Sequence, residues 1–191
     1  MKVYNDLLLA ADNGDVSALC LLDLTAAFDT VDHDLMMLKL ERQFGLRGVV
    51  LDWSWSYLCG RTYRVESFTV ARRRVGLLFT LCSVPQGSVL GPRMFILYAT
   101  DLEDVAAKHS VNIHGYADDT QVYLHGHRDD MTSTARRLEN CIIDVGQWMS
   151  ANRQKLNTEK TELLWAGSRH GQSSVTDYRP SLQLGADTVT A

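Results

Sequence analysis

Two adjacent aspartates, Asp118 and Asp119, constrain this chain more than any other feature. They lie between two short segments, residues 111–114 and 121–124, which have the composition and length of strands. The sequence therefore predicts a β-hairpin with two carboxylates at its tip. Two neighbouring negative charges are unfavourable unless a positive charge neutralises them, and a divalent metal ion is the obvious candidate.

A third carboxylate, Asp23, ends an apolar run at residues 19–22. An aspartate directly after such a run is costly to bury unless it has a partner. Three carboxylates at strand ends are typical of two-metal phosphoryl transfer, in which two ions roughly 3.5–4 Å apart hold the attacking and leaving oxygens. We therefore predict that Asp23 joins Asp118 and Asp119 as a metal ligand.

Four motifs follow one another along the chain: LDLTAAFD at residues 22–29, VPQGSVLGP at 84–92, YADD at 116–119 and LNTEKT at 156–161. An Asp-Asp pair alone is weak evidence of relationship, because acidic pairs are common on loops. Together and in this order, the four motifs resemble those of the reverse transcriptases, and in particular the non-LTR (LINE-type) retrotransposon branch. The resemblance extends from about Lys2 to Thr190.

The resemblance implies a role for each acidic residue and for one lysine. Asp23 and Asp118 would be the primary ligands of two Mg²⁺ ions, with Mn²⁺ as an alternative, and Asp119 would be a secondary ligand. Lys160 would be the general acid that protonates the pyrophosphate leaving group. Lys155 is its rival on spacing alone.

Three further residues are implied to bind the incoming nucleotide or the template. Phe28 matches an aromatic position whose ring excludes the 2′-hydroxyl of the sugar, although its alternative role is a core phenylalanine. Gln86 and Gly87 precede a predicted helix, where the glycine lets the backbone approach a ligand closely. The same residues also suit an ordinary strand-to-helix turn.

The resemblance implies an RNA-directed DNA polymerase that extends a DNA primer on an RNA template with dNTPs. Phe28 argues against an RNA-directed RNA polymerase, which must admit the 2′-hydroxyl. We expect the fingers and thumb elements of the family to be largely absent, so the alternative is a truncated, inactive retrotransposon remnant that binds nucleic acid weakly at most. We expect this chain alone to be inactive.

Composition bounds the remaining possibilities. A net charge of −4 over 191 residues is unusual for nucleic-acid binding, and the basic clusters at residues 61–64, 72–74 and 136–137 are as consistent with solvated surface charge. The longest apolar stretch, residues 75–82, is too short to span a membrane, and we see no signal peptide. The four cysteines have no CxxC spacing, which predicts buried free thiols without a disulfide-linked partner. We expect an intracellular protein, nuclear or cytoplasmic, that is not secreted.

The order of predicted elements indicates an α+β fold, a polymerase palm-like antiparallel sheet covered by helices on one face. We expect residues 1–167 to form a partial reverse transcriptase domain, a palm with a remnant of fingers, and residues 168–191 to be a loosely ordered tail. Asp32 or Asp34 is expected to cap its helix. The predicted helices cover residues 2–11, 32–44, 47–59, 89–107 and 129–150. The predicted strands are one that ends at Asp23, a hairpin within 61–84, the hairpin around residue 118, and 161–166.

Overall fold

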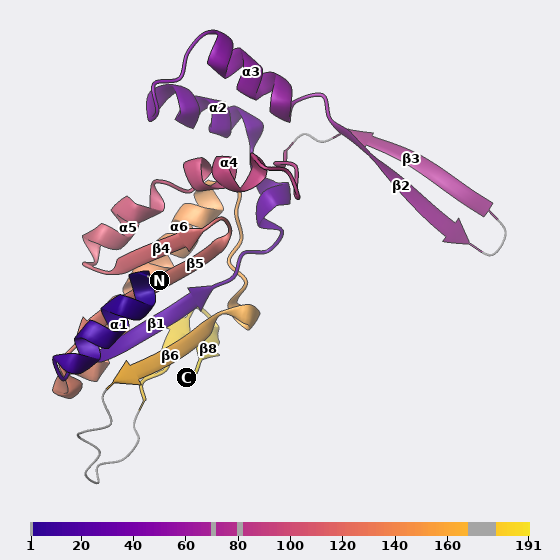
Figure 1. The fold of residues 1–191 in the computed structure, drawn as a ribbon. Helices are drawn as coiled ribbons and strands as arrows, with labels where there is room; N and C mark the ends of the chain where they lie inside the picture. The colour runs from indigo at the N-terminus through magenta and orange to yellow at the C-terminus, as the bar shows by residue number, and fades with distance from the viewer. Residues whose placement is uncertain (1, 70–71, 80–81, 168–178) are drawn as a thin grey trace. The chain divides into compact units, whose positions relative to one another are not determined.

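The computed structural model of the chain describes residues 2–69, 72–79, 82–167 and 179–191. The chain divides into two compact units. The first unit contains residues 1–25 and 99–191, and the second contains residues 26–98 (Figure 1). No helix of the described ranges is both long and apolar enough to cross a membrane.

The first unit is built on a four-stranded antiparallel sheet with the strand order β4-β5-β1-β6. The predicted hairpin is confirmed, and so is the strand that precedes Asp23. The strands are β1 (Val16–Leu22), β4 (Asn112–Tyr116), β5 (Asp119–Gly126) and β6 (Glu162–Gly167).

Side chains of β1 alternate between the two faces of this sheet, as strand geometry requires. Ala18, Cys20 and Leu22 are buried in the main hydrophobic core, together with Val122 of β5 and Leu163 of β6. The long helix α6 (Met131–Ala151) and the short helix α5 (Leu102–Lys108) supply the other half of this core. The predicted α+β layer of helices on an antiparallel sheet is thereby confirmed.

A further helix, α1 (Lys2–Asp12), lies over the opposite face of the sheet, where Figure 1 shows it in front and α6 behind. The Tyr123 hydroxyl on this face donates a 2.6 Å hydrogen bond to Asp6 of α1. Burial and this bond raise the pKa of Tyr123, because the charged phenolate would lose hydration and face the Asp6 carboxylate. Helices thus contact both faces of the sheet, and α1 shields part of the face opposite the core.

The end of the chain is more ordered than we expected. Residues 182–184 and 187–189 form the antiparallel hairpin β7 (Leu182–Leu184) and β8 (Asp187–Val189). Its three apolar side chains, Leu182, Leu184 and Val189, are buried in the core against α6. The expectation of a loosely ordered tail is therefore wrong for residues 179–191, and residues 168–178 lie outside the described ranges.

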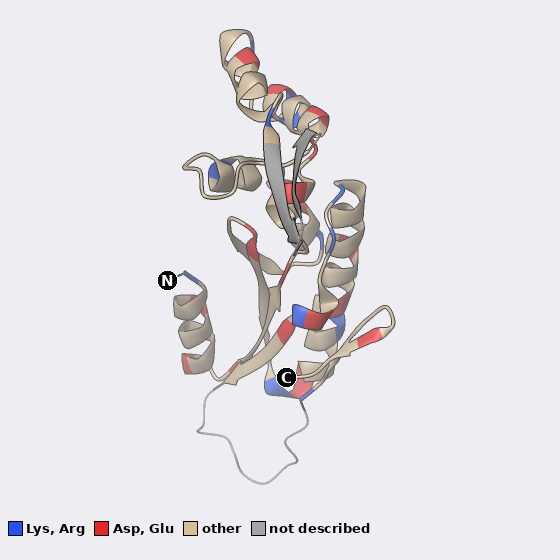
Figure 2. Ribbon diagram, turned by 90° about the vertical axis from the view of Figure 1, so that its right-hand side faces the viewer, with Lys and Arg blue, Asp and Glu red and all other residues tan. Residues whose placement is uncertain are grey.

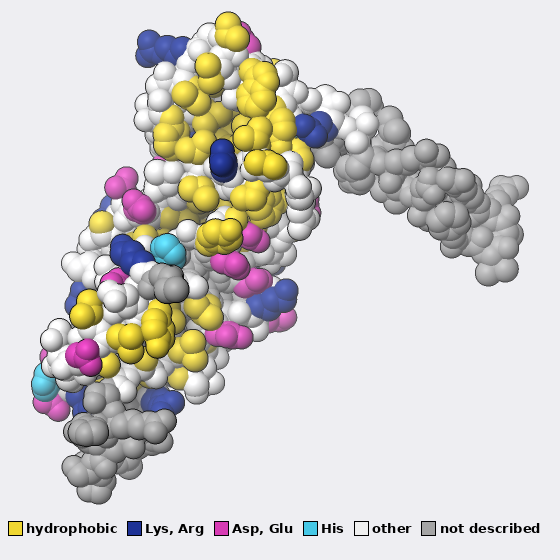
Figure 3. All heavy atoms as spheres, viewed as in Figure 1, with side chains coloured by type: hydrophobic (Ala, Val, Ile, Leu, Met, Phe, Trp, Pro, Cys, Tyr) yellow, Lys and Arg dark blue, Asp and Glu magenta, His cyan; other side chains and the backbone are white. Residues whose placement is uncertain are grey.

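The described residues of the second unit form three α-helices, a 3₁₀ turn at Ala27–Thr30 and a pair of antiparallel strands. The predicted cap is confirmed, because the Asp32 side chain accepts a 2.8 Å hydrogen bond from the Leu35 backbone. Figure 3 shows apolar side chains gathered on the surface of this unit, and Val49, Val50 and Trp53 of α3 are among its exposed residues. The elements are α2 (His33–Arg42), α3 (Val49–Leu58), β2 (Thr62–Thr69), β3 (Arg72–Phe79) and α4 (Gly91–Tyr98).

The single helix predicted over residues 89–107 is wrong, because two helices, α4 and α5, occupy this stretch. Between them, Leu102 donates its backbone N–H to Ala99 and Glu103 donates to Thr100, so tight three-residue turns replace the α-helical pattern. Thr100 and Asp101 favour such a break, since their side chains compete for backbone hydrogen bonds.

Candidate active site at the end of the four-stranded sheet

The register between β1 and β5 brings two of the predicted carboxylates to neighbouring positions. Leu22 of β1 is paired with Thr120 of β5, so Asp23 and Asp119 occupy the next positions along the two strands. Residues opposite each other on antiparallel strands point to the same face. This face is opposite to the one that Leu22 and Thr120 bury, and it is the face that α1 partly covers.

Asp118 lies in the turn between β4 and β5, directly before Asp119. Tyr116 and Asp119 close this turn as a strand pair, and Ala117 adopts a left-handed conformation with φ of 57°. A two-residue turn of this kind needs positive φ to match the twist of its strands. The tight turn therefore fixes Asp118 and Asp119 at the tip, where Asp118 is half-buried and Asp119 is exposed.

The fourth motif, residues 156–161, contacts Asp23. Asn157 donates its backbone N–H to the Asp23 carbonyl oxygen at 2.9 Å and its side-chain amide to Asp23 Oδ2 at 3.1 Å. The ammonium of Lys160, in the 3₁₀ turn Thr158–Lys160, lies 4.0 Å from the same oxygen. Lys155, the rival on spacing, uses its backbone carbonyl to accept a hydrogen bond from Thr25. Lys160 is thus the lysine that the structure pairs with Asp23.

The donor chemistry of Asp23, Asp118 and Asp119 fits a divalent cation, since Mg²⁺ takes carboxylate oxygens as ligands. Within the described ranges, however, no group of three or more His, Cys, Asp or Glu side chains is arranged to hold a metal ion. The chain therefore presents the carboxylates at adjacent strand ends without a closed ligand set.

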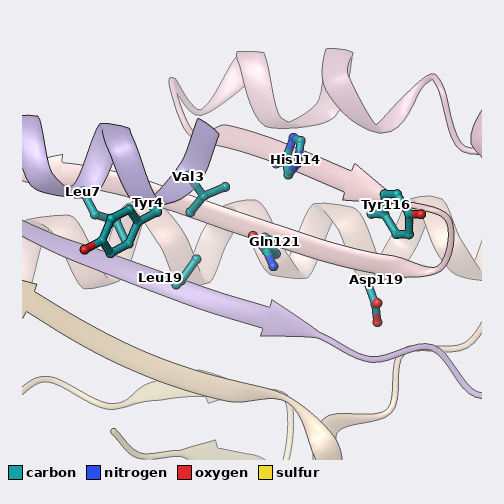
Figure 4. Close-up of a pocket in the computed structure, with 8 residues that line it drawn as sticks. All are labelled: Val3, Tyr4, Leu7, Leu19, His114, Tyr116, Asp119 and Gln121. Carbon is teal, nitrogen blue, oxygen red and sulfur yellow. The ribbon is translucent and has the colours of Figure 1, made fainter. Parts of the chain in front are cut away.

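A cavity of about 410 Å³ opens next to Asp119, between α1 and the sheet. Figure 4 shows the Asp119 carboxylate projecting from the start of β5 toward the chain that leaves β1. Apolar side chains of α1 line one end of the cavity, and polar side chains of the hairpin line the other. The lining residues are Val3, Tyr4, Leu7, Leu19, His114, Tyr116, Asp119 and Gln121.

The predicted nucleotide-binding residues all lie in the second unit, where the segments that carry them are bonded together. Val84 donates its backbone N–H to the Phe28 carbonyl at 2.8 Å. The Phe28 ring stacks on Phe95, with 5.4 Å between centroids, and is half-buried. Phe28 thus has a packing role in this unit, which is compatible with a second role toward a ligand.

Gln86 and Gly87 form an exposed turn before α4. Gly87 has a φ of 77°, which an L-residue rarely adopts, so the turn requires glycine there. Ser88 supports the turn, because its hydroxyl donates to the Pro85 carbonyl and accepts from the Gly91 backbone. The Gln86 side chain is exposed at the tip of this rigid turn.

Arginines of the predicted basic clusters contact different kinds of group. Arg137 donates to the carbonyl oxygens of His109 and Ser110 at 3.1 Å, and Arg61 stacks on Tyr57. Figure 2 shows both signs of charge along α6. The side chains at residues 72–74 lie outside the described residues. Arg137 therefore joins α6 to the residues that follow α5, and Arg61 packs beside the end of α3.

The four cysteines are free, and the prediction that they are buried holds for two of them. Cys20 and Cys141 are buried, whereas Cys59 and Cys82 are half-buried. Burial raises the pKa of Cys20 to about 12 and, together with the Asp144 charge, that of Cys141 to about 11. These two thiols are inert core groups.

Comparison with known proteins identifies the family. A family model described as "Reverse transcriptase (RNA-dependent DNA polymerase)" matches residues 5–179. The RNA-directed DNA polymerase from mobile element jockey of Drosophila melanogaster is 29% identical over 175 residues, covering 89% of this chain and 18% of the relative. The probable RNA-directed DNA polymerase from transposon BS of the same organism is 30% identical over 171 residues, covering 84% and 17%. The chain thus spans less than a fifth of the length of these relatives.

The fold is similar to that of solved telomerases. Telomerase from Candida albicans, in complex with a fragment of telomeric RNA, matches with a TM-score of 0.63 and 16% identity over 96% of this chain and 32% of that one. Apo telomerase from Candida tropicalis, truncated from its C-terminal domain, matches with a TM-score of 0.61 and 13% identity over 100% and 40%. These likenesses support the palm-like α+β fold. The match of the family model over residues 5–179 shows that the chain belongs to the reverse transcriptase (RNA-dependent DNA polymerase) family.

Proposed function

We propose that this chain supplies the nucleotidyl-transfer centre of an RNA-directed DNA polymerase. In the reaction, the 3′-hydroxyl oxygen of a DNA primer forms a bond to the α-phosphorus of a dNTP. The bond between that phosphorus and the oxygen bridging to the β-phosphate breaks, and pyrophosphate leaves. An RNA template selects the dNTP, and solvent takes up the proton of the 3′-hydroxyl.

Asp23 and Asp118 are the proposed principal ligands of two Mg²⁺ ions, with Asp119 as the secondary ligand. Bound divalent ions would neutralise phosphate charge and activate the attacking oxygen. The β1–β5 register supports this assignment, because it carries Asp23 to the end of the hairpin.

Lys160 is the proposed general acid for the leaving pyrophosphate. Its ammonium is exposed and lies beside Asp23, so it can reach a phosphate and give up a proton to it. A cation at this position also stabilises the negative charge that develops on the leaving group.

Phe28, Gln86 and Gly87 are the proposed residues that bind the nucleotide or template. A Phe28 ring held by Phe95 is rigid enough to exclude a 2′-hydroxyl by contact. Gln86 offers both a donor and an acceptor at the tip of a turn fixed by Gly87. The preference for deoxynucleotides would thus come from shape, and base or template contacts from hydrogen bonds.

One observation carries the proposal. The first, third and fourth motifs meet at one end of one sheet, because Asp23 contacts Asn157 and Lys160 and is next in register to Asp119. An inactive remnant would not need to keep this arrangement, so that alternative is not favoured. The free cysteines support a reducing, intracellular setting, nuclear or cytoplasmic.

The test is primer extension on an RNA template by a jockey-type polymerase in which residues 5–179 replace the matching segment. We expect Mg²⁺-dependent cDNA synthesis that Asp118→Asn lowers by about 100-fold or more. The matched control is Asp12→Asn, an exposed aspartate at the end of α1, which should extend as the unaltered chimera does. Equal activity of the Asp118 and Asp12 variants would refute the proposed centre.

A further inference from the structure

Asn157 holds Asp23 at two points, through its main chain and through its side chain. Its backbone N–H donates to the Asp23 carbonyl oxygen at 2.9 Å, and its Nδ2 donates to Asp23 Oδ2 at 3.1 Å. The two residues are 134 positions apart in the sequence, so this contact is a product of the tertiary fold. A main-chain bond alone would join the two segments; the side-chain bond additionally sets the direction of the carboxylate.

The segment that carries Asn157 is itself fixed. Thr25 donates its backbone N–H to the Lys155 carbonyl at 2.8 Å, and Leu24 forms a β-bridge with Leu156. The Asn157 carbonyl accepts from the Lys160 backbone at 3.2 Å and from the Thr161 hydroxyl at 2.9 Å. Hydrogen bonds therefore fix the main chain on both sides of Asn157, the residue whose side-chain amide contacts Asp23.

The chain beyond this point is braced by the C-terminal hairpin. The Thr158 hydroxyl donates a 2.6 Å hydrogen bond to the Asp187 carboxylate of β8. The core burial of Leu182 and Val189 holds that hairpin in place. Rigid support of this kind is what a residue needs in order to orient another side chain rather than follow it.

The contact with Asn157 occupies one oxygen of Asp23 and leaves the other for a ligand role. Oδ2 accepts from Asn157 and faces Lys160 at 4.0 Å, and a carboxylate has a second oxygen with two lone pairs. An amide is a suitable holder, because it donates a hydrogen bond without adding a charge that would repel a cation. Without this contact the half-exposed Asp23 side chain would sample several rotamers. Its affinity for a metal ion would then fall, because binding would have to order the side chain.

From these contacts we infer that Asn157 is a positioning residue, which orients the Asp23 carboxylate for divalent-metal binding without touching the metal or the substrate. The inference rests on the proposed function, since it assumes that Asp23 is a metal ligand. The fourth motif then has two roles: Lys160 acts on the leaving group, and Asn157 orients Asp23.

The experiment measures Mn²⁺ binding to the purified 191-residue chain by electron paramagnetic resonance, which reports free Mn²⁺. Asn157→Ala should weaken the Asp23-dependent binding by about tenfold, the lower end of the roughly 10–100-fold expected when a residue that orients a metal ligand is removed. Asn157→Gln keeps an amide donor and should recover most of the affinity. Asn112→Ala, an exposed asparagine on the edge strand β4, is the matched control and should bind as the unaltered chain does.

Each outcome decides one of the two claims. If Asp23→Asn abolishes Mn²⁺ binding while Asn157→Ala leaves it unchanged, the positioning role is overturned and the proposed function stands. If the unaltered chain binds no Mn²⁺ in an Asp23-dependent way, the proposed metal centre fails, and the inference fails with it.

A metal-free measurement separates positioning from a general effect on folding. The side-chain amide resonances of Asn157 should shift in Asp23→Asn and stay in place in Asp15→Asn, with the thermal midpoint of both variants close to that of the unaltered chain. Unshifted Asn157 resonances in a folded Asp23→Asn chain would show that the amide does not hold the carboxylate, and would overturn the inference. If Asn157→Ala alone fails to fold, this resonance test and the Gln variant decide the question.

Discussion

Leu22 of β1 is paired with Thr120 of β5, and this register carries Asp23 and Asp119 to adjacent positions at the ends of two neighbouring strands. A shift of one residue would turn every side chain of β1 to the other face of the sheet. The buried Ala18, Cys20 and Leu22 oppose such a shift, because it would expose them. Core packing thus determines where the proposed metal ligands lie.

Lys160 and Asn157 contact the same oxygen of Asp23 but should affect metal binding in opposite directions. Lys160→Met removes a positive charge 4.0 Å from Asp23 Oδ2, so Mn²⁺ binding should strengthen. The gain should stay below about 1 kcal/mol, because the ammonium is largely exposed to water. In the chimeric polymerase the same variant should slow nucleotide addition, since the leaving group loses its acid. Lys155→Met is the matched control. If Lys155→Met lowers the rate of nucleotide addition more than Lys160→Met does, Lys155 is the general acid.

Phe28 should determine the choice of sugar in a polymerase that carries this domain. Phe28→Ala opens space beside the Phe95 ring, so relative ribonucleotide incorporation should rise about tenfold or more, or about 1.4 kcal/mol of transition-state discrimination. Phe28→Tyr retains the ring and should retain the preference for deoxynucleotides. Competition between dNTP and rNTP in primer extension measures the ratio. An unchanged ratio in Phe28→Ala would leave Phe28 with its packing role alone.

The two buried thiols should resist alkylation, which proceeds through the thiolate. With a pKa of about 12, Cys20 has a thiolate fraction of about 10⁻⁴ at pH 8. Iodoacetamide should therefore modify the half-buried Cys82 first, and should reach Cys20 and Cys141 only after unfolding. Peptide mass spectrometry identifies the sites. Rapid labelling of Cys20 in the folded chain would contradict its place in the core.

The same thiols make stability depend on pH in the alkaline range. Their folded-state pKa values, about 12 for Cys20 and about 11 for Cys141, lie above the ordinary value of 9.0. The stabilisation is fully present below pH 9 and is lost as pH rises from 9 toward 12, because the unfolded chain releases its thiol protons first. Urea unfolding should show a falling free energy over this window. The double variant Cys20→Ser/Cys141→Ser should show a smaller fall in the free energy of unfolding than the unaltered chain when both are measured at the same pH values.

The C-terminal hairpin should contribute to the stability of the first unit. Leu182 is fully buried against α6, so Leu182→Ala should lower the free energy of unfolding by about 2–5 kcal/mol. Leu164→Ala is the matched control, because Leu164 of β6 is 47% exposed and should lose well under 2 kcal/mol. Urea denaturation followed by circular dichroism measures both. Equal losses would mean that β7 and β8 are not docked in the core.

Periodicity and turn chemistry allowed most elements to be predicted. The strand that ends at Asp23, the Asp32 cap and the hairpin around Asp118 each follow from a few neighbouring residues, and all three are present. The break between α4 and α5 was missed although Thr100 and Asp101 favour it, because apolar residues lie on both sides of these two positions. The hairpin β7–β8 was missed because its strands of three residues are too short for a pattern, and only burial of Leu182 against a distant helix makes them stable.

The motifs of the candidate site were predictable from the sequence, but the way in which they group in space was not. Asp23, Asp118, Asp119 and Lys160 stand out by type and spacing, yet their grouping depends on strand register, which one sequence does not reveal. Asn157 belongs to the fourth motif but gave no sign of its own, since its partner is 134 positions away. The only available signal was the position of Asn157 three residues before Lys160.

The most direct test of the account asks whether the three carboxylates form one metal site. Mn²⁺ added in trace amounts to the isotopically labelled 191-residue chain broadens the nuclear magnetic resonance signals of nearby amides. The account predicts that residues 22–24, 117–120 and 157–160 broaden together at the lowest Mn²⁺ concentration, and that Asp118→Asn removes the effect from all three segments. Broadening centred on the acidic turn at residues 128–130, or spread evenly over the acidic surface, would contradict it.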